Sequence, residues 1–475
     1  MRVGAGAIAV LLALAPALAK AGDDSDLIPR GVLDAKPEAE LATAAPAGPR
    51  SSPALYGKVF AEEALSVWSP ARRMPVPEPP SLLLRWQNRA SLDAGMHWKL
   101  EPWLTLTLSD RLNVFEQDGQ KLVTANTVRN DLREASASWQ PTDNYYLEAG
   151  RINVRNGAAL GFNPTDFFKT RSLVGQASLD PSVIRQNRLG TLMLRAQALW
   201  AWGSTSIAYA PKLANPSQVS EKNPVGVDPR FDATNAAHRV LCTLSLELLD
   251  LSPQLLGYFE LHRSKLGVNV TRPIGNAVVV YAEWAAGPEQ NLIARAADFG
   301  TRTGTLPPSA SRLPETDLRV SLRSDLTSGL SWTLATAVTL NVEYHFHEAG
   351  FTRNDWKNWF ALGSASGAPG APASPAGALW FVRGYASDQQ EPLSKHQVFI
   401  RASWPRALGP DLELDAFAFV SLLDGSVLSQ LAANYYVSGA WTASAYFSWN
   451  FGNAHTERGS FAQRGNTTVA LTRYF

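Results

Sequence analysis

Apolar and polar residues alternate along most of this chain, in segments of about ten residues that are separated by turn-forming residues. The clearest segment runs from 84 to 99, with polar residues at the odd positions and mainly apolar residues at the even ones. The same alternation recurs at 317–323, 340–347 and 442–449. Because successive side chains of a strand point to opposite faces, each segment predicts a β-strand with one polar and one apolar face.

The connections between these strands alternate between short and long. The short connections carry turn-forming residues and lie at 101–102, 141–144, 202–204, 251–253, 273–276, 328–330, 406–411 and 438–440. The long connections lie at 70–81, 117–130, 154–189, 211–237, 287–315, 348–395 and 451–463, with shorter ones near 264 and 424–425. Counting from a first strand at 57–68 to a last strand at 466–475 gives about eighteen strands.

This pattern predicts an all-β fold: a single transmembrane antiparallel up-and-down β-barrel of about 18 strands over 57–475. Alternate side chains would face lipid and a polar lumen, and the even strand count would place both chain ends at one rim. After the first twenty residues, no stretch approaches the roughly 18 consecutive apolar residues of a transmembrane helix. Any membrane span is therefore expected to be made of strands.

The N-terminus predicts export from the cytoplasm. Arg2 precedes an apolar run at 8–14 and an A-x-A sequence at 17–19, a pattern typical of a cleaved signal peptide, 1–19. The alternative, an N-terminal membrane anchor, would need a longer apolar run. Residues 20–56 are rich in Ala, Pro and charge without any period, and they predict a disordered periplasmic segment.

The last strand ends on Phe475, with Val469 and Leu471 on the same face. Together with the chain length, strand count and loop rhythm, this ending resembles the large porin-like outer-membrane proteins of Gram-negative bacteria. Over about 57–475 the chain looks most similar to alginate-export-type eighteen-stranded barrels. The resemblance implies an outer-membrane location among lipid and lipopolysaccharide, and assembly with periplasmic chaperones and the barrel assembly machinery, for which Phe475 would be the signal. It also implies passive passage of small solutes or of an anionic polysaccharide.

The connection at 154–189 is long, polar and aromatic, and it looks like a porin constriction loop. Its apolar residues would favour packing against the inner wall, which would place Arg155, Asp166, Lys169 or Arg171 near the permeation path. The alternative is an extracellular loop without a gating role.

Basic residues recur at positions whose phase predicts a lumenal side chain. They are Arg85, Arg89 and Arg111 on two neighbouring strands, and Arg319 and Arg323 on another. Such a row could attract anions. Acidic residues are almost equally frequent at lumenal positions, so a polar network that fills and stiffens the lumen is an equal alternative.

No catalytic or cofactor-binding motif occurs in the sequence, so we expect neither an enzyme nor a cofactor. Cys242 is the only cysteine, which leaves no intramolecular disulfide. His345 and His347 share one strand face, and we interpret them as hydrogen-bonded lumenal side chains rather than metal ligands. Nothing points to nucleic acid, to a particular solute or to an oligomeric state. The sequence therefore favours a passive solute channel, with an outer-membrane enzyme or scaffold whose lumen is plugged as the alternative.

Overall fold

The computed structural model of the chain describes residues 54–71, 76, 84–117, 128–216, 228–261, 263–307, 318–365 and 376–475. The predicted signal peptide and the predicted N-terminal segment up to residue 53 lie outside these residues. Among the described residues, no helix is long and apolar enough to cross a membrane.

Strands make up most of the described chain. They are β1 (Ala54–Pro70), β2 (Trp86–Glu101), β3 (Leu104–Gln117), β4 (Val128–Thr142), β5 (Tyr145–Ile152), β6 (Thr191–Trp200), β7 (Gly203–Ala210), β8 (Arg239–Leu246), β9 (Ser252–Glu260), β10 (Lys265–Ile274), β11 (Val278–Glu289), β12 (Ser321–Thr333), β13 (Thr339–His347), β14 (His396–Trp404), β15 (Leu412–Ser421), β16 (Val427–Ser438), β17 (Trp441–Phe451) and β18 (Gln463–Tyr474).

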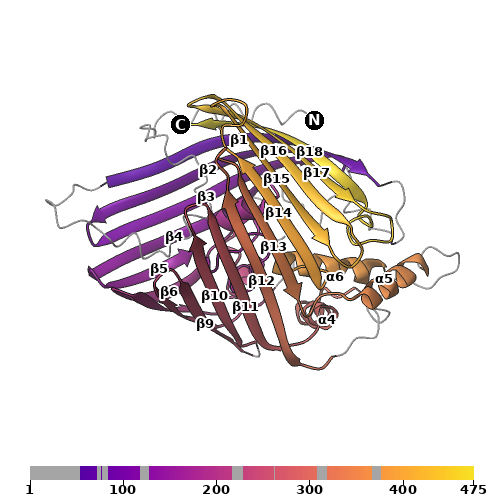
Figure 1. Cartoon of the computed structure of the whole chain (residues 1–475), viewed down its shortest axis with the longest axis horizontal. Coiled ribbons are helices and arrows are strands. Elements are labelled where there is room, and N and C mark those ends of the chain that lie inside the picture. The colour runs from indigo at the N-terminus through magenta and orange to yellow at the C-terminus, as the bar shows by residue number, and fades with distance from the viewer. Residues whose placement is uncertain are drawn as a thin grey trace.

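These strands form one closed antiparallel sheet of 18 strands. Each strand pairs with the next along the chain, and β18 pairs back with β1, where Phe60 lies opposite Tyr474 and Trp68 opposite Asn466. In Figure 1 the strands run obliquely around the molecule, from indigo β1 to yellow β18. The predicted fold, an antiparallel β-barrel of about eighteen strands, is confirmed.

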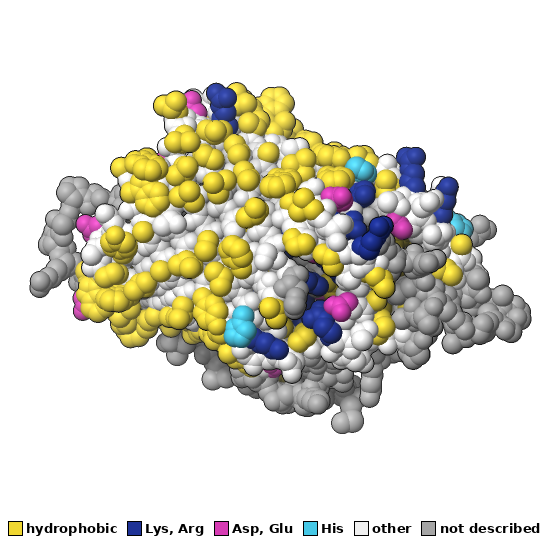
Figure 2. All heavy atoms as spheres, turned by 90° about the horizontal axis from the view of Figure 1, so that it is seen from below, with side chains coloured by type: hydrophobic (Ala, Val, Ile, Leu, Met, Phe, Trp, Pro, Cys, Tyr) yellow, Lys and Arg dark blue, Asp and Glu magenta, His cyan; other side chains and the backbone are white. Residues whose placement is uncertain are grey.

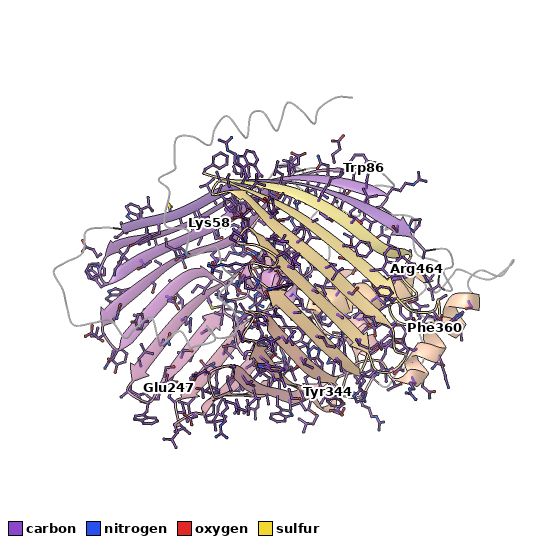
Figure 3. All side chains as sticks on the ribbon, turned by 45° about the horizontal axis from the view of Figure 1, so that its top comes forward. Lys58, Trp86, Glu247, Tyr344, Phe360 and Arg464 are labelled. Carbon is purple, nitrogen blue, oxygen red and sulfur yellow. The ribbon has the colours of Figure 1, made fainter. Side chains whose placement is uncertain are left out.

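The long connections lie at one rim of the barrel, together with the two short ones after β9 and β15, and the other rim carries only short turns. Labelled side chains in Figure 3 mark the two ends: Lys58 and Glu247 lie toward the rim of the short turns, and Trp86, Phe360 and Arg464 toward the other. The longest connections join β5 to β6, β11 to β12 and β13 to β14. We call the first of these, residues 153–190, the β5–β6 segment.

One predicted turn is wrong. Residues 328–330 lie inside β12, and the chain turns instead after that strand, where Leu334 and Val338 form a backbone hydrogen bond of 2.8 Å. Gly329 is small because the inner wall is crowded there: a Cβ atom would lie 2.8 Å from Cγ of Glu343 and 2.9 Å from Cε2 of Tyr281. Similarly, the alternating stretch at 317–323 joins the sheet only from Ser321 onward.

The outer face of the sheet is apolar and the inner face is polar. Along β13, for example, Val342 is exposed, whereas its neighbours Asn341 and Glu343 are buried. Leu65 of β1 and Leu194 of β6 are likewise exposed on the outside. Figure 2 shows hydrophobic side chains spread widely over the face seen from below, with Lys and Arg gathered toward one side. Burial thus follows the alternation of the sequence, as two environments on the two sides of a barrel wall require.

Within the part of the chain that the structure describes, the helices lie in the long connections. They are α2 (Pro181–Gln186), α3 (Phe231–Thr234), α4 (Leu292–Thr303), α5 (Arg353–Ala365) and α6 (Ala376–Gln389). Buried apolar side chains that include Phe299, Trp359 and Tyr385 hold α4, α5 and α6 together at one end of the barrel, as Figure 1 shows. Asn291 caps α4 by accepting a hydrogen bond of 2.9 Å from the amide of Ala294.

Candidate functional site in the barrel lumen

Strands β1 to β4 carry a network of ion pairs on their inward faces. Glu62 accepts hydrogen bonds of 2.7 Å from Nη2 of Arg89 and from Nη2 of Arg111. Asp93 lies 2.5 Å from a guanidinium nitrogen of Arg133 and 3.6 Å from one of Arg111. Each of these guanidinium groups therefore faces a carboxylate on another strand.

This pairing bears on the predicted row of basic residues. Arg89 and Arg111 are each only 5% exposed, and both bind the carboxylate of Glu62. Because buried charges are tolerated when they are paired and hydrogen-bonded, the arrangement has the features of a network that stiffens the wall. Little uncompensated positive charge is left on these two strands to attract an anion.

The other three residues of the predicted row lie apart from Arg89 and Arg111. Arg85 precedes β2 and Arg319 precedes β12, and both side chains are exposed. Arg323 lies on β12, where its Nε donates a hydrogen bond of 3.1 Å to the backbone oxygen of Glu289. The five residues therefore occupy separate surroundings on two walls and one rim.

The β5–β6 segment binds inward side chains on distant strands. The carboxylate of Glu283 on β11 accepts a hydrogen bond of 2.6 Å from the amide of Ala159. That of Glu343 on β13 accepts from the amides of Leu160, at 2.6 Å, and Gly161, at 2.9 Å. Five strands lie between β5 and β11 in the sheet order and seven between β5 and β13, so the contacts cross the space that the barrel encloses.

The second half of the segment contacts two further strands. The amide of Leu179 donates to Oε1 of Gln430 on β16 at 3.0 Å, and Nε of Arg401 on β14 donates to Asp180 at 2.7 Å. Asp180 also caps α2, because its side chain accepts from the amide of Ser182 at 2.8 Å. One carboxylate thus positions both the short helix and the wall contact.

Asp166 lies in a buried ion pair within the segment. Its two oxygens accept hydrogen bonds of 2.8 and 2.9 Å from the two terminal nitrogens of Arg188, and Nε of Arg185 lies 3.6 Å away. Asp166 and Arg188 are each 2% exposed. Of the four segment residues predicted near the permeation path, Asp166 is therefore enclosed by protein, whereas Arg155 is exposed.

Lys169 has an unusual environment for a lysine. Its Nζ donates a hydrogen bond of 2.5 Å to the backbone oxygen of Asn163 and lies 4.4 Å from the ring centroid of Phe162. Burial lowers the pKa of Lys169 to about 8, although Asp166 and Glu391 act in the opposite direction. Its charge therefore changes within a pH range that a channel experiment can reach.

Arg171 connects the segment to two other connections. Its Nη1 donates a hydrogen bond of 2.6 Å to the backbone oxygen of Asp232, and its guanidinium lies 5.3 Å from the ring centroid of Phe299 on α4. Its backbone amide donates to the oxygen of Asp388 on α6 at 2.7 Å. Arg171 thus joins the segment to the connections that carry α3, α4 and α6.

A cavity of about 460 Å³ lies among these connections, and both Lys169 and Arg171 line it. Its lining carries seven basic and six acidic side chains, beside aromatic residues such as Phe167 and Tyr258. In Figure 2, basic and acidic side chains lie next to each other around a hollow in the molecular surface. The charges that line the cavity are therefore nearly balanced.

The acidic groups of this cavity are themselves paired. Arg295 of α4 binds Glu391 at 2.7 Å and Glu289 at 3.0 Å, and Lys265 lies 3.1 Å from Glu289. Burial alone would raise the pKa of Glu391, but Arg295 and the neighbouring His347 and Lys265 lower it to about 2. Glu391 therefore stays ionised at neutral pH.

The two lumenal histidines each bind a carboxylate. Nε2 of His345 lies 2.7 Å from Glu343, and Nδ1 of His347 lies 2.7 Å from Asp325. Sequence phase identified these side chains as lumenal. The role of Glu283 and Glu343 as acceptors for the β5–β6 segment had no sequence signal, because their partners are backbone amides.

Solved structures of similar fold exist. The crystal structure of Pseudomonas aeruginosa OccK5 (OpdH) is 8% identical, with a TM-score of 0.51 over 89% of this chain and 98% of that chain. Acinetobacter baumannii OccAB1 is 8% identical, with a TM-score of 0.49 over 89% and 96% of the two chains. The outer membrane protein opdK from Pseudomonas aeruginosa is 7% identical, with a TM-score of 0.48 over 89% and 99%.

No protein-family model matches the chain, and no curated protein matches it. At 8% identity the likeness to OccK5 concerns the fold alone.

Proposed function

We propose that this protein is a bacterial outer-membrane channel that lets small or anionic solutes pass through its lumen without an energy source. The observation that carries the proposal is the closed 18-stranded sheet, with apolar side chains outside and polar or charged side chains inside. A barrel of this kind satisfies every strand hydrogen bond within the sheet, as a lipid environment demands. The rim of short turns would face the periplasm and the rim of long connections the cell exterior.

Conductance tests this proposal directly. Purified protein in a planar lipid bilayer should give single-channel current steps, and polymers of increasing size should define the radius that excludes them. The absence of steps at any voltage, with protein shown to be folded and inserted, would contradict a channel.

We further propose that the β5–β6 segment narrows the channel, with Arg155, Lys169 or Arg171 near the path and Asp166 fixing the shape of the segment. Its hydrogen bonds to β11, β13, β14 and β16 support this role. The basic residues Arg85, Arg89, Arg111, Arg319 and Arg323 would contribute to the lumenal field, mostly as members of ion pairs or at the rim.

Removal of the segment provides the test of narrowing. Deleting about 165–183 should raise single-channel conductance several-fold, because current through a pore is limited by its narrowest part. Insertion into the bilayer should persist, since the deletion spares β5 and β6. Unchanged conductance and ion selectivity would mean that the segment does not limit flow.

A plugged barrel with an enzymatic or scaffolding role is the second candidate. The observation that favours it is the number of contacts from the β5–β6 segment to distant strands, together with the packed α4, α5 and α6 at the same end. The two candidates differ in outcome: a plugged barrel gives no current steps until the segment is deleted. The balanced charge of the cavity makes small solutes better candidates than the polysaccharide that alginate-export-type barrels would carry.

A further inference from the structure

We propose that Glu283 and Glu343 form a two-carboxylate latch that holds the β5–β6 segment against the inner wall and thereby sets the width of the path. The proposal rests on the channel function proposed above. It assigns a positioning role to two wall residues, one on β11 and one on β13.

Three consecutive backbone amides form the segment side of the latch. The amide of Ala159 donates to Oε1 of Glu283, and the amides of Leu160 and Gly161 donate to the two oxygens of Glu343. The distances, 2.6, 2.6 and 2.9 Å, are short, as is typical of hydrogen bonds to a charged acceptor. A continuous stretch of segment backbone is therefore bound by a pair of carboxylates.

Further donors, from the wall for Glu343 and from the segment for Glu283, keep the two carboxylates in place. Tyr281 donates its hydroxyl hydrogen to Glu343 at 2.8 Å, and Nε2 of His345 lies 2.7 Å from the same carboxylate. Thr165, from the segment, donates to Glu283 at 3.1 Å. Within the described residues, neither carboxylate forms an ion pair with a lysine or arginine. The segment amides are thus principal partners of these two buried groups, and loosening the segment would leave the carboxylates without them.

Glycine at position 161 allows the close approach that the latch needs. A Cβ atom on Gly161 would lie 2.6 Å from Cγ of Phe399 and 2.8 Å from Cε1 of His345. Any other residue would push the segment away from the wall. Immediately after it, Oγ1 of Thr327 donates a hydrogen bond of 2.7 Å to the backbone oxygen of Phe162 and extends the contact.

The latch restrains only one part of the segment. The contacts of Leu179 with Gln430 and of Asp180 with Arg401 involve other strands and do not depend on the two glutamates. Loss of the latch should therefore free the stretch around 156–165 without unfolding the barrel. In a conducting channel this freedom would appear as added fluctuation of the open current.

The test uses Glu283→Gln, Glu343→Gln and their combination, in the full-length protein. Gln keeps the size of the side chain but replaces one acceptor oxygen by an NH₂ group. Because the segment amides are donors, that NH₂ group cannot accept a hydrogen bond from them. Gly161→Ala displaces the segment while leaving both carboxylates intact. Glu413→Gln is the matched control, because Glu413 is a buried lumenal carboxylate that accepts a hydrogen bond of 2.6 Å from the hydroxyl of Tyr436 on β16 rather than from the segment.

Two readouts separate the latch from the channel function. The first is the rate of trypsin cleavage after Arg155 in folded protein, because the residues that follow Arg155 belong to the stretch that the latch restrains. This readout requires no conduction. The second is open-channel current noise and mean conductance in a planar bilayer. We expect the double Gln variant and Gly161→Ala to be cleaved several-fold faster than wild type and to show more noise, with Glu413→Gln unchanged in both.

Wild-type cleavage rates in both the double Gln variant and Gly161→Ala would overturn the latch, whatever the conductance. If wild-type protein carries no current, the channel function fails, and the cleavage rates still decide whether the glutamates hold the segment. Should a Gln variant fail to fold, as judged by its migration before and after heating, Gly161→Ala provides the decision.

Discussion

At the scale of single residues, Lys169 offers a titration that can be followed in a working channel. Its pKa of about 8 lies below the usual lysine value because of burial, so the ammonium group is charged below pH 8 and neutral above it. Raising the pH from about 7 to about 9 should change the group from roughly nine-tenths charged to roughly one-tenth charged. Loss of this positive charge should lower the permeability of anions relative to cations, measured from the reversal potential in a salt gradient.

The variant Lys169→Met provides the comparison for this titration. It should have a reversal potential close to that of wild type at high pH and should lose most of the change between pH 7 and 9. An equal pH response in Lys169→Met would assign the titration to another group.

The ion pair of Asp166 and Arg188 should matter more for stability than for conduction. Arg188→Met removes two hydrogen bonds from a carboxylate that is 2% exposed and leaves it beside the more distant Arg185. Breaking one partner of a buried pair costs about 3–5 kcal/mol, because the other charge stays buried. We expect cleavage of the β5–β6 segment by trypsin to begin at a lower temperature in this variant.

The double variant Asp166→Asn/Arg188→Met distinguishes loss of the pair from loss of packing. It should recover part of the stability, since no uncompensated carboxylate is left. A double variant as unstable as the sum of the two single variants would show that the two side chains act independently.

At the scale of elements, β18 determines whether the barrel can close. The strand pairs with β17 on one side and with β1 on the other. The amide of Phe475 donates a hydrogen bond of 3.0 Å to the backbone oxygen of Val59. The guanidinium of Arg473 lies 4.9 Å from the ring centroid of Phe475. We predict that Phe475→Ser slows insertion and increases periplasmic degradation, measured by pulse-labelling and heat-modified migration. Phe451→Ser, which removes an exposed aromatic residue from the other end of β17, should insert normally. Equal insertion of Phe475→Ser and wild type would make Phe475 an ordinary strand residue.

Sequence alternation predicted the strands well where the outer face of the wall is apolar and the inner face is polar along the whole strand. The alternating stretches at 84–99 and 340–347 correspond to β2 and β13. The helices α4, α5 and α6 were not predicted, because they lie in the connections outside the sheet. A shared apolar cluster stabilises them, and its residues do not follow the alternation of a strand. The error at 328–330 arose because glycine served close packing in the lumen rather than a turn.

For the candidate site, the sequence predicted which side chains face the lumen but not which residues they contact. Phase placed Arg89, Arg111 and Glu343 on the inner face, and all three are buried there. Their partners lie on other strands or on the β5–β6 segment, and phase contains no information about which strand comes close across the lumen. The segment has no period, so the enclosure of Asp166 by Arg188 could not be predicted.

At the scale of the whole molecule, the contacts of the β5–β6 segment cross the space inside the barrel, and packed connections lie at one end. The β5–β6 segment contacts β11, β13, β14 and β16, and α4, α5 and α6 share one apolar cluster. The deletion of about 165–183 therefore also tests the connections that remain. Its effect on conductance shows how far those connections restrict the current. A several-fold rise would mean that they leave a wide path.

The pairing of β1 with β18 has a consequence for the order in which the barrel folds. Ser66 and Thr468 form a side-chain hydrogen bond across this pair although 402 residues separate them, whereas the other strand pairs join neighbours along the chain. Such a non-local pair must wait until the whole chain has been synthesised, and it bears the entropy of closing the largest loop in the molecule. Joining Phe475 to Ala54 through a flexible linker, which must span the five residues by which β1 extends past Phe475, and opening the chain at 439–440 would preserve every strand pair and move this last event to β16 and β17. The order in which the strands pair thus depends on where the chain termini lie, whereas the final fold does not.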